Sequence, residues 1–125
     1  MAKIAFINIP AHGHTNPTLP VVRKLVQHGH HVLYYTSDEF SEKVISVGAD
    51  FRAYPQTLYT SKQISQRMHS LLDASLMMMD MSEIYTKWTI AEMQNEHPDL
   101  IIYDTTTMWG YIAARVLDIP AICAI

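Results

Sequence analysis

The chain has 125 residues, of which 49% are hydrophobic and 17% charged, as expected for one globular domain. Its formal net charge of −3 and its scattered Lys and Arg residues argue against a nucleic-acid-binding surface. The one cysteine, Cys123, excludes an internal disulfide, and its place in the apolar run PAICAI predicts a buried structural thiol. No apolar run approaches the ~18 residues of a membrane span, and the N-terminal run is too short for a signal peptide. We therefore expect a soluble, cytoplasmic protein.

The first half of the chain alternates apolar runs with helically spaced residues. The run KIAFINI predicts a strand that is buried on both faces. Pro17 and Pro20 fit the first turn of a following helix, where the amides have no intrahelical partner. The predicted elements are a strand over 3–9, a helix over 19–26, a strand over 31–36, a helix from Ser37 with the apolar face Phe40, Val44, Ile45 and Val47, and a strand over 50–54.

The second half predicts long helices and then two more strands. After a loop at 55–60, apolar residues from Ile64 to Met79 are spaced for a helix, and 81–94 continues in helical register until Pro98 breaks it. The residues expected to face inward in this second stretch are Ile84, Tyr85, Trp88, Ala91 and Met93. The last predicted elements are a strand over 99–103, a helix over 107–117 and a strand over 120–125.

Strands that alternate with helices in this order predict a parallel sheet covered by helices on both faces. Right-handed crossovers make this a Rossmann-like three-layer α/β sandwich with the strand order 3-2-1-4-5. The sequence stops in an apolar strand, which leaves a bare sheet edge. We therefore expect residues 1–125 to form one incomplete domain of a larger protein.

Polar residues follow the two strands between which this order reverses, and ligands of open parallel sheets bind at that reversal. The first strand is followed by His12, Gly13 and His14, and the fourth ends at Asp104. His14 and Asp104 should therefore face each other although they are 90 positions apart. A carboxylate fixes the tautomer of a histidine and stabilises the imidazolium that forms when the other nitrogen takes a proton. The pair is therefore predicted to act as a general base.

Neighbouring residues suit a ligand that carries phosphates. Gly13 lets the loop bend and lets a substrate approach the backbone. A helix that starts near Asn16 or Thr18 would point free amides at the same place, and Thr105 follows Asp104 there. Gly13, Asn16 and Thr105 are therefore predicted to bind substrate.

Two other interpretations of these residues stay open. His12, His14 and Asp104 could be metal ligands of a hydrolase, although a tetrahedral site needs a fourth ligand. The pair could also be structural, in a Rossmann-like module that binds without catalysis. The dinucleotide fingerprint GxGxxG is absent, which argues against NAD. Surface or capping roles are expected for the histidines around the end of the first helix, His28, His30 and His31.

The segment IPAHGHTNPTLPVVRKLVQHGHHVLYYTSDEF, followed by VGADFRAYP, resembles the start of macrolide-type UDP-glycosyltransferases of glycosyltransferase family 1. PDLIIYD resembles the fourth strand of the same enzymes. The likeness covers nearly the whole chain and is weakest from Gln56 to Glu96. It implies the GT-B architecture, in which an N-terminal Rossmann-like domain binds the acceptor and a C-terminal one binds the nucleotide sugar across a cleft.

The resemblance also implies roles for the candidate residues. The His of the GHxNP motif is the catalytic base of such enzymes and corresponds to His14, and its Asp partner corresponds to Asp104. The implied reaction is inverting: the hydroxyl of a small apolar acceptor attacks the anomeric carbon of a UDP-sugar, with no cofactor and no metal. The helices between the third and fourth strands would line the acceptor pocket with Met77, Met78, Trp88 and Trp109.

The donor-binding half of that architecture is missing from the chain. The resemblance therefore predicts that the chain holds the catalytic pair and part of the acceptor pocket but does not turn over alone. Its expected partners are the acceptor, the UDP-sugar and a C-terminal donor domain, in cis or as a separate chain.

Overall fold

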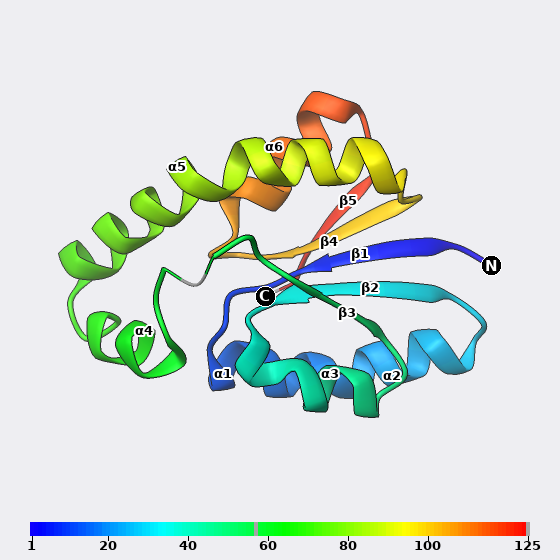
Figure 1. Cartoon of the computed structure of the whole chain (residues 1–125), viewed down its shortest axis with the longest axis horizontal. Coiled ribbons are helices and arrows are strands. Elements are labelled where there is room, and N and C mark those ends of the chain that lie inside the picture. The colour runs from blue at the N-terminus through cyan, green and yellow to red at the C-terminus, as the bar shows by residue number, and fades with distance from the viewer. Residues whose placement is uncertain (57, 125) are drawn as a thin grey trace.

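The computed structural model describes residues 1–56 and 58–124. Its five strands form one parallel sheet in the predicted order, β3-β2-β1-β4-β5 (Figure 1). The strands are β1 (Lys3–Ile7), β2 (His31–Thr36), β3 (Asp50–Ala53), β4 (Leu100–Asp104) and β5 (Ala121–Ala124). Residue 125 of the predicted last strand lies outside the described residues. Cys123 on the edge strand β5 is only half-buried, so the prediction of a fully buried thiol is wrong.

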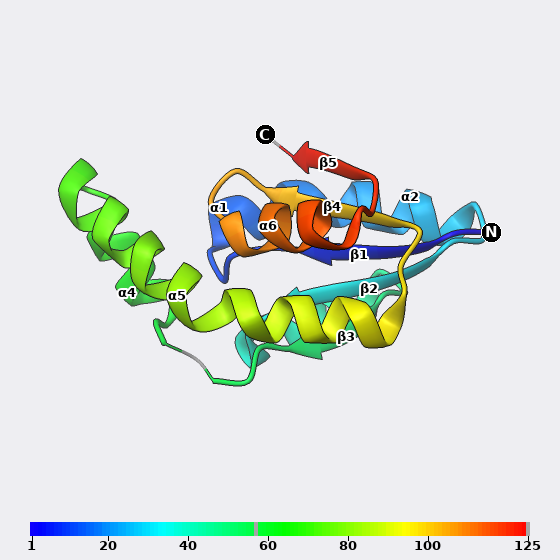
Figure 2. The same cartoon turned by 90° about the horizontal axis from the view of Figure 1, so that it is seen from above.

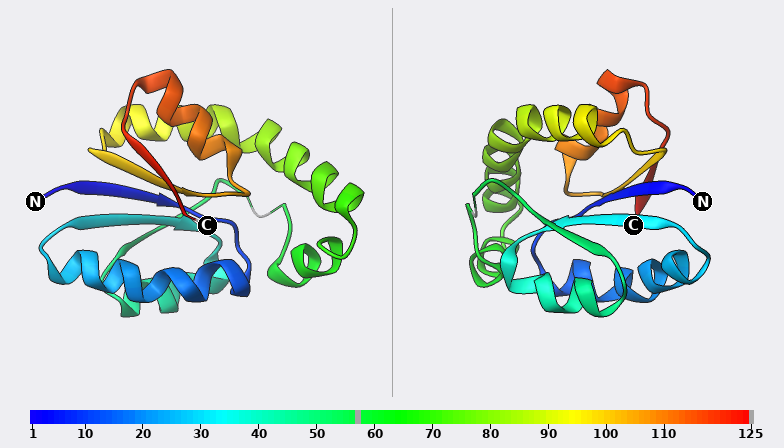
Figure 3. Two further views of the ribbon diagram at one scale, coloured as in Figure 1. Left: turned by 180° about the vertical axis from the view of Figure 1, so that it is seen from behind. Right: turned by 45° about the vertical axis from the view of Figure 1, so that its right-hand side comes forward.

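Helices cover both faces of the sheet, which confirms the three-layer sandwich (Figures 1 and 2). One face carries α2 (Leu19–Gln27) and α3 (Ser41–Ser46), and the other carries α5 (Leu71–Glu96) and α6 (Met108–Leu117). The view from behind shows α2 running along the sheet on the side opposite to α5 (Figure 3). The shorter elements are α1 (His12–Thr15), η1 (Asn16–Thr18), η2 (Asp38–Phe40) and α4 (Ser61–Arg67).

The core has two layers because side chains alternate between the faces of each strand. In β1, Ile4 and Phe6 pack with α2 and α3, whereas Ala5 and Ile7 pack with α5 and α6. All four are at most 2% exposed, so the prediction that this strand is buried on both faces is confirmed. Burial of each large apolar side chain contributes about 1.5–3 kcal/mol to the free energy of folding. The side chains of β1 therefore stabilise both layers of the core.

The helical segment after β1 begins earlier than predicted. It starts as α1 at His12 rather than near Asn16 or Thr18. Pro17 has no N–H with which to continue the α-helical pattern, and the chain passes through the 3₁₀ turn η1 before α2. Pro20 lies in the first turn of α2, as expected. His14 therefore lies in a helical turn and not in an open loop.

The predicted helical stretch from Ile64 to Met79 is interrupted by a turn at 68–70, and its second part joins the predicted stretch over 81–94 in one helix, α5, of 26 residues. Its first turn is capped by Ser70, and it ends at His97, whose φ of 51° is left-handed, immediately before Pro98. The buried side chains recur every four residues: Met77, Met81, Tyr85, Thr89 and Met93. Three residues expected to face inward are exposed instead, namely Ile84 and Ala91 in α5 and Ile45 in α3.

The beginning of α5 projects with α4 beyond the carboxyl ends of the strands (Figures 1 and 2). We call residues 61–79, which comprise α4, the turn after it and the start of α5, the α4–α5 arm. The sheet does not extend beneath the start of α5, so Leu71 is 86% and Leu72 67% exposed there. Apolar spacing therefore predicted the helix correctly but not its burial. Within the described part of the chain, no helix has both the length and the apolar character needed to cross a membrane.

Ion pairs attach the other end of α5 to the sheet. Nζ of Lys3 in β1 lies 2.8 Å from Oε1 of Glu96, and Arg52 in β3 also pairs with Glu96. Arg52 contacts Glu92 one turn earlier, at 3.5 Å. The hydrogen bonds from Lys3 and Arg52 lower the pKa of Glu96. This network contributes stability above the ordinary pKa of a glutamate, and the contribution is lost as pH falls through the lowered value.

Two glycines that end helices provide a matched test of the packing. Gly29 after α2 and Gly48 after α3 have φ values of 87° and 90°. A Cβ at Gly48 would lie 2.9 Å from Cγ1 of Val26, whereas a Cβ at Gly29 would have no neighbour within 4 Å. We expect Gly29→Ala to cost about 1 kcal/mol through its left-handed backbone, and Gly48→Ala to cost more. Urea denaturation measures both; equal losses would mean that Val26 moves aside without cost.

Candidate active site

His14 and Asp104 meet beyond the carboxyl ends of β1 and β4, as the strand order predicted. Nδ1 of His14 lies 3.0 Å from Oδ2 and 3.1 Å from Oδ1 of Asp104. The two strands are neighbours in the sheet, with Ile7 opposite Tyr103. The residues that follow each strand are therefore brought to the same place. The predicted juxtaposition is confirmed.

Hydrogen bonds keep Asp104 ionised in its buried position. The main-chain N–H of Thr106 donates to Oδ2 at 3.0 Å, and its hydroxyl donates to the same oxygen. Burial by itself raises the pKa of Asp104, but the hydrogen bonds from His14 and Thr106 outweigh it, and the pKa is lowered. The hydrogen bond to Asp104 raises the pKa of His14 above its usual 6.5, against the opposing effect of burial.

The pair has the geometry of a general base with an orienting carboxylate. Asp104 is an acceptor, so Nδ1 of His14 carries the hydrogen between them, and in the neutral ring Nε2 is the proton acceptor. The side chain of His14 is 30% exposed, whereas that of Asp104 is 9% exposed. A ligand can therefore reach the imidazole while the carboxylate stays behind it.

A hollow of about 370 Å³ lies in front of His14. One wall is α1 and the residue before it, and the other is α4 and the two residues after it. We call this hollow the α1–α4 groove; it is lined by Ala11, His12, Gly13, His14, Ile64, Ser65, Met68 and His69. The sequence predicted Ile64 and Met68 as part of a helix and gave no place in the site to Ile64, Ser65, Met68 or His69, which the fold brings opposite His14.

The predicted substrate-binding residues separate into several places. Gly13 lines the α1–α4 groove, but it is helical, so the prediction that it bends a loop is wrong. Thr105 is exposed beside Asp104, while Thr106 makes the hydrogen bonds. Asn16 lies outside the α1–α4 groove and accepts a hydrogen bond from Lys43 at 3.2 Å.

The aromatic and methionine candidates are mostly core residues. Met77 and Trp109 are 0% exposed, and the indole N–H of Trp109 donates to the hydroxyl of Tyr54. Their prediction as lining residues is therefore corrected: both pack between the sheet and α5 or α6. Trp88 is half-buried and lies edge-on against Tyr54. Met78 lines a different hollow, between α5 and the start of α6.

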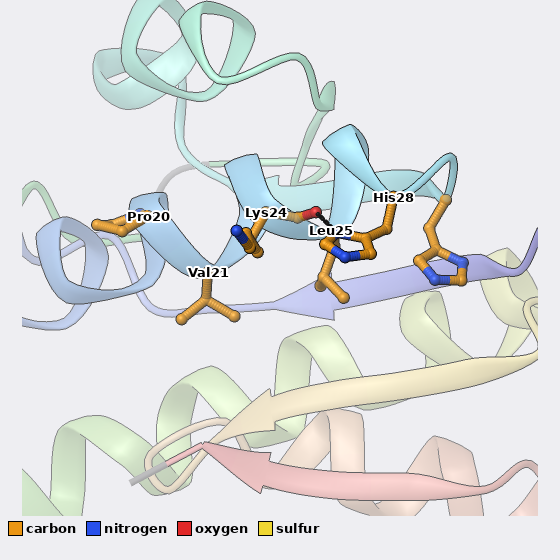
Figure 4. A pocket seen from close by; sticks show the side chains of 6 residues that line it. Pro20, Val21, Lys24, Leu25 and His28 are labelled. Carbon is orange, nitrogen blue, oxygen red and sulfur yellow. Dashed lines mark hydrogen bonds between the residues drawn. The ribbon is translucent and has the colours of Figure 1, made fainter.

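Another hollow, of about 590 Å³, runs along α2 (Figure 4). It lacks a histidine–carboxylate pair: Nδ1 of His28 is bonded to the carbonyl of Lys24, and Nδ1 of His30 accepts from the N–H of Ala2. His31 lies 3.6 Å from Asp50. The capping and surface roles predicted for these histidines are confirmed. The lining residues are Pro20, Val21, Lys24, Leu25, His28 and His30.

The metal-site interpretation has no complete ligand set. Over residues 1–56 and 58–124, no group of three or more His, Cys, Asp or Glu side chains is placed to hold an ion. The ring of His12 lies edge-on against Phe40, with centroids 4.9 Å apart. The geometry therefore favours the histidine–carboxylate pair over a metal centre.

The sheet order and the pair at its reversal have the form expected of a glycosyltransferase domain. No family model matches the chain. Among curated proteins, it is 39% identical over 127 residues to the NDP-glycosyltransferase YjiC of Bacillus subtilis, covering 95% of this chain and 30% of that protein. It is 32% identical over 130 residues to the oleandomycin glycosyltransferase of Streptomyces antibioticus, covering 97% of this chain and 28% of that protein.

A solved structure agrees with these relatives. The glycosyltransferase of kitacinnamycin superposes with a TM-score of 0.79 and 28% identity, covering 98% of this chain and 29% of that one. The comparisons confirm the predicted resemblance to macrolide-type glycosyltransferases with the GT-B fold. The chain spans less than a third of the length of these proteins.

The raised pKa of His14 provides a test of the pair that needs no substrate. We expect Asp104→Asn to lower the pKa of His14, because the hydrogen bond and the charge that raise it are both weakened. Titration of the histidine ring signals by NMR measures this change. Asp118→Asn is the matched control, since Asp118 is an exposed residue after α6 whose left-handed backbone suits Asn. An unchanged His14 titration in Asp104→Asn would mean that the pair does not form in solution.

Proposed function

We propose that this chain supplies the catalytic base and part of the acceptor site of an inverting glycosyltransferase with a nucleotide-sugar donor. The observation that carries the proposal is the 3.0 Å contact between Nδ1 of His14 and Asp104, made by a histidine whose side chain is 30% exposed and lines a hollow. The similarity to named glycosyltransferases along 95–97% of the chain supports it. The donor, a UDP-sugar, would be held mainly by a C-terminal domain, in cis or as a separate chain.

The proposed step is a single displacement. The acceptor O–H gives its proton to Nε2 of His14 as its oxygen bonds to the anomeric carbon, and the bond from that carbon to the diphosphate breaks. The electron pair leaves with UDP, and the configuration at the carbon is inverted. Asp104 stabilises the imidazolium that forms. The step uses no cofactor and no metal.

The α1–α4 groove supports a small, largely apolar acceptor. Met68, which is 39% exposed, places apolar surface opposite His14, with the buried Ile64 behind it, and Ser65 and His69 are the polar side chains on the same wall. An aromatic or macrolide alcohol could pack against these apolar groups and present its hydroxyl to the base. Gly13, which has open space where a Cβ would be, leaves room for it.

The role of His14 is tested by joining the chain to the complementary part of the Bacillus subtilis relative. UDP release is measured with a phenolic acceptor. We expect His14→Ala to reduce turnover by ~10²-fold or more, the usual effect of losing a general base. Asp104→Ala should cost less but remain severe, because the ring loses its orientation.

His12→Ala is the matched control for that experiment. His12 is two residues away and lines the same groove, but its ring lies edge-on against Phe40, whereas that of His14 bonds to Asp104. The variant should lower turnover far less than His14→Ala, because it removes no partner of Asp104. If His14→Ala and Asp104→Ala both kept full turnover, the pair would be structural, and a module that binds without catalysis would become the better interpretation.

The acceptor site is tested with a pair of exposed apolar residues on the arm. Met68 is 39% and Leu76 49% exposed, but only Met68 lines the α1–α4 groove. In the joined protein we expect Met68→Ala to raise the KM for an aromatic acceptor about 10-fold with little change in kcat, since one apolar contact is lost. Leu76→Ala should leave KM unchanged. Equal effects of the two variants would move the acceptor away from this groove.

A further inference from the structure

Asn8 is a polar residue at the end of an apolar strand, and it is 0% exposed. Its amide nitrogen lies 3.0 Å from the carbonyl oxygen of His14 and 2.8 Å from the hydroxyl of Tyr34. Its amide oxygen accepts from the N–H of Ile9 at 2.8 Å. A carbonyl can only accept and an N–H can only donate, so these partners fix which way the amide faces. Both N–H groups of Asn8 are therefore used, one of them on the main chain of the base.

A second series of hydrogen bonds leads from Asn8 to the next residue of α1. The hydroxyl of Thr18 lies 2.6 Å from the carbonyl of Thr15 and 2.7 Å from the hydroxyl of Tyr34. Thr18 has one hydroxyl hydrogen, which the carbonyl of Thr15 takes. Tyr34 must therefore donate to Thr18 and accept from Asn8. The bonds run in one direction, from Asn8 through Tyr34 and Thr18 to Thr15.

These bonds fix a segment that helical hydrogen bonding alone leaves incomplete. Pro17 offers no N–H to the carbonyls of α1, and the α-helical pattern changes to η1 at Asn16. Side-chain donors from Asn8 and Thr18 hold the carbonyls of two successive residues, His14 and Thr15. Tyr34 is itself fixed, because its ring stacks on Phe6 with centroids 5.0 Å apart.

The opposite side of the pair is fixed to the same strand. The hydroxyl of Thr107 donates to the carbonyl of Ile7 at 3.1 Å, or to that of Asp104 at 3.0 Å. The end of β1 is thus the common support: Asn8 holds the turn with His14, and Ile7 contacts the turn after Asp104. The distance between the two side chains depends on both attachments.

We propose that Asn8, Tyr34 and Thr18 are positioning residues for His14: their hydrogen bonds, buried or partly buried, hold the base at bonding distance from Asp104. None of them touches the substrate in this arrangement. The inference deepens the proposed function, since it assigns what orients its base. It also makes a prediction about the pair itself that holds whether or not the chain takes part in sugar transfer.

The sharpest test uses Thr18, which is only half-buried. Thr18→Val keeps the shape but removes the hydroxyl, whereas Thr18→Ser keeps the hydroxyl. We expect the pKa of His14, followed by NMR on this chain, to fall toward 6.5 in Thr18→Val and to stay raised in Thr18→Ser. Tyr34→Phe, which retains the stacked ring, should act like Thr18→Val. His12 and His69 line the same groove, so the ring signals must first be assigned to each histidine.

Thr36→Val is the matched control, because Thr36 lies two residues after Tyr34 in β2. Its hydroxyl is buried without a hydrogen-bond partner among the described residues. Losing that hydroxyl should leave the titration of His14 unchanged. If Thr18→Val and Tyr34→Phe fold and titrate like the unaltered chain, the bonds serve folding alone and the proposal is overturned.

The protein joined to the complementary part of the Bacillus subtilis relative gives a second readout. A displaced base should lower kcat about 10-fold or more in Thr18→Val with little change in KM, and Thr18→Ser should restore it. A raised KM with unchanged kcat would contradict a positioning role. If the NMR results hold while His14→Ala retains full turnover, the positioning role stands and the proposed function fails.

Discussion

The candidate site depends on a hydrogen bond between groups that are distant in sequence, Nδ1 of His14 and the carboxylate of Asp104. Each partner is costly to place: an ionised carboxylate loses water when buried, and a histidine loses freedom when its ring is fixed. Their mutual bond offsets part of both costs, and Thr106 contributes the rest of the solvation of the carboxylate. Because the bond needs β1 and β4 side by side, it forms only when the parallel sheet has folded.

The parallel pairing of β1 and β4 explains how His14 and Asp104 are brought together. Register between β1 and β4 sets Ile7 beside Tyr103, and both strands point the same way. Asp104 at the carboxyl end of β4 and His14 in the turn beyond β1 are therefore brought together. Two buried side chains fix the orientation: Asn8, just after β1, donates to the carbonyl of His14, and Thr107, at the start of α6, donates to the carbonyl of Ile7. The sheet therefore sets where His14 and Asp104 lie, and buried polar side chains set how the two turns are oriented.

The strands, their order and the meeting of His14 with Asp104 could be predicted from the sequence, because they follow from the spacing of apolar residues and the order of the strands. Apolar runs located the strands, and their order placed His14 opposite Asp104. The positioning residues were missed because one polar residue in an apolar run, such as Asn8, has no periodic pattern. The available signal was that an amide side chain stands at the end of a strand predicted to be buried. The sequence could not decide between core and pocket for Met77 and Trp109, since residues of both kinds have the same composition.

The same limit explains the errors on α5. Helical periodicity fixes which residues lie on a common face but not which neighbour that face meets. Where α5 crosses the sheet, a face with a four-residue repeat is buried, and where the helix runs past the sheet the same kind of residue meets solvent. Leu71 and Leu72 are helical as expected, yet no strand lies beneath them to bury them.

Because the α4–α5 arm projects beyond the sheet, substitutions on it and substitutions on the packed part of α5 have different effects on stability. Substitutions on the face of α5 that packs against the sheet disturb a close-packed interior and lower the free energy of unfolding of the whole domain. Side chains on the arm, such as Leu72 and Met79, contribute little to that interior and can change at small cost to folding. A chain built in this way can vary the surface of the arm while the strands that position His14 stay the same.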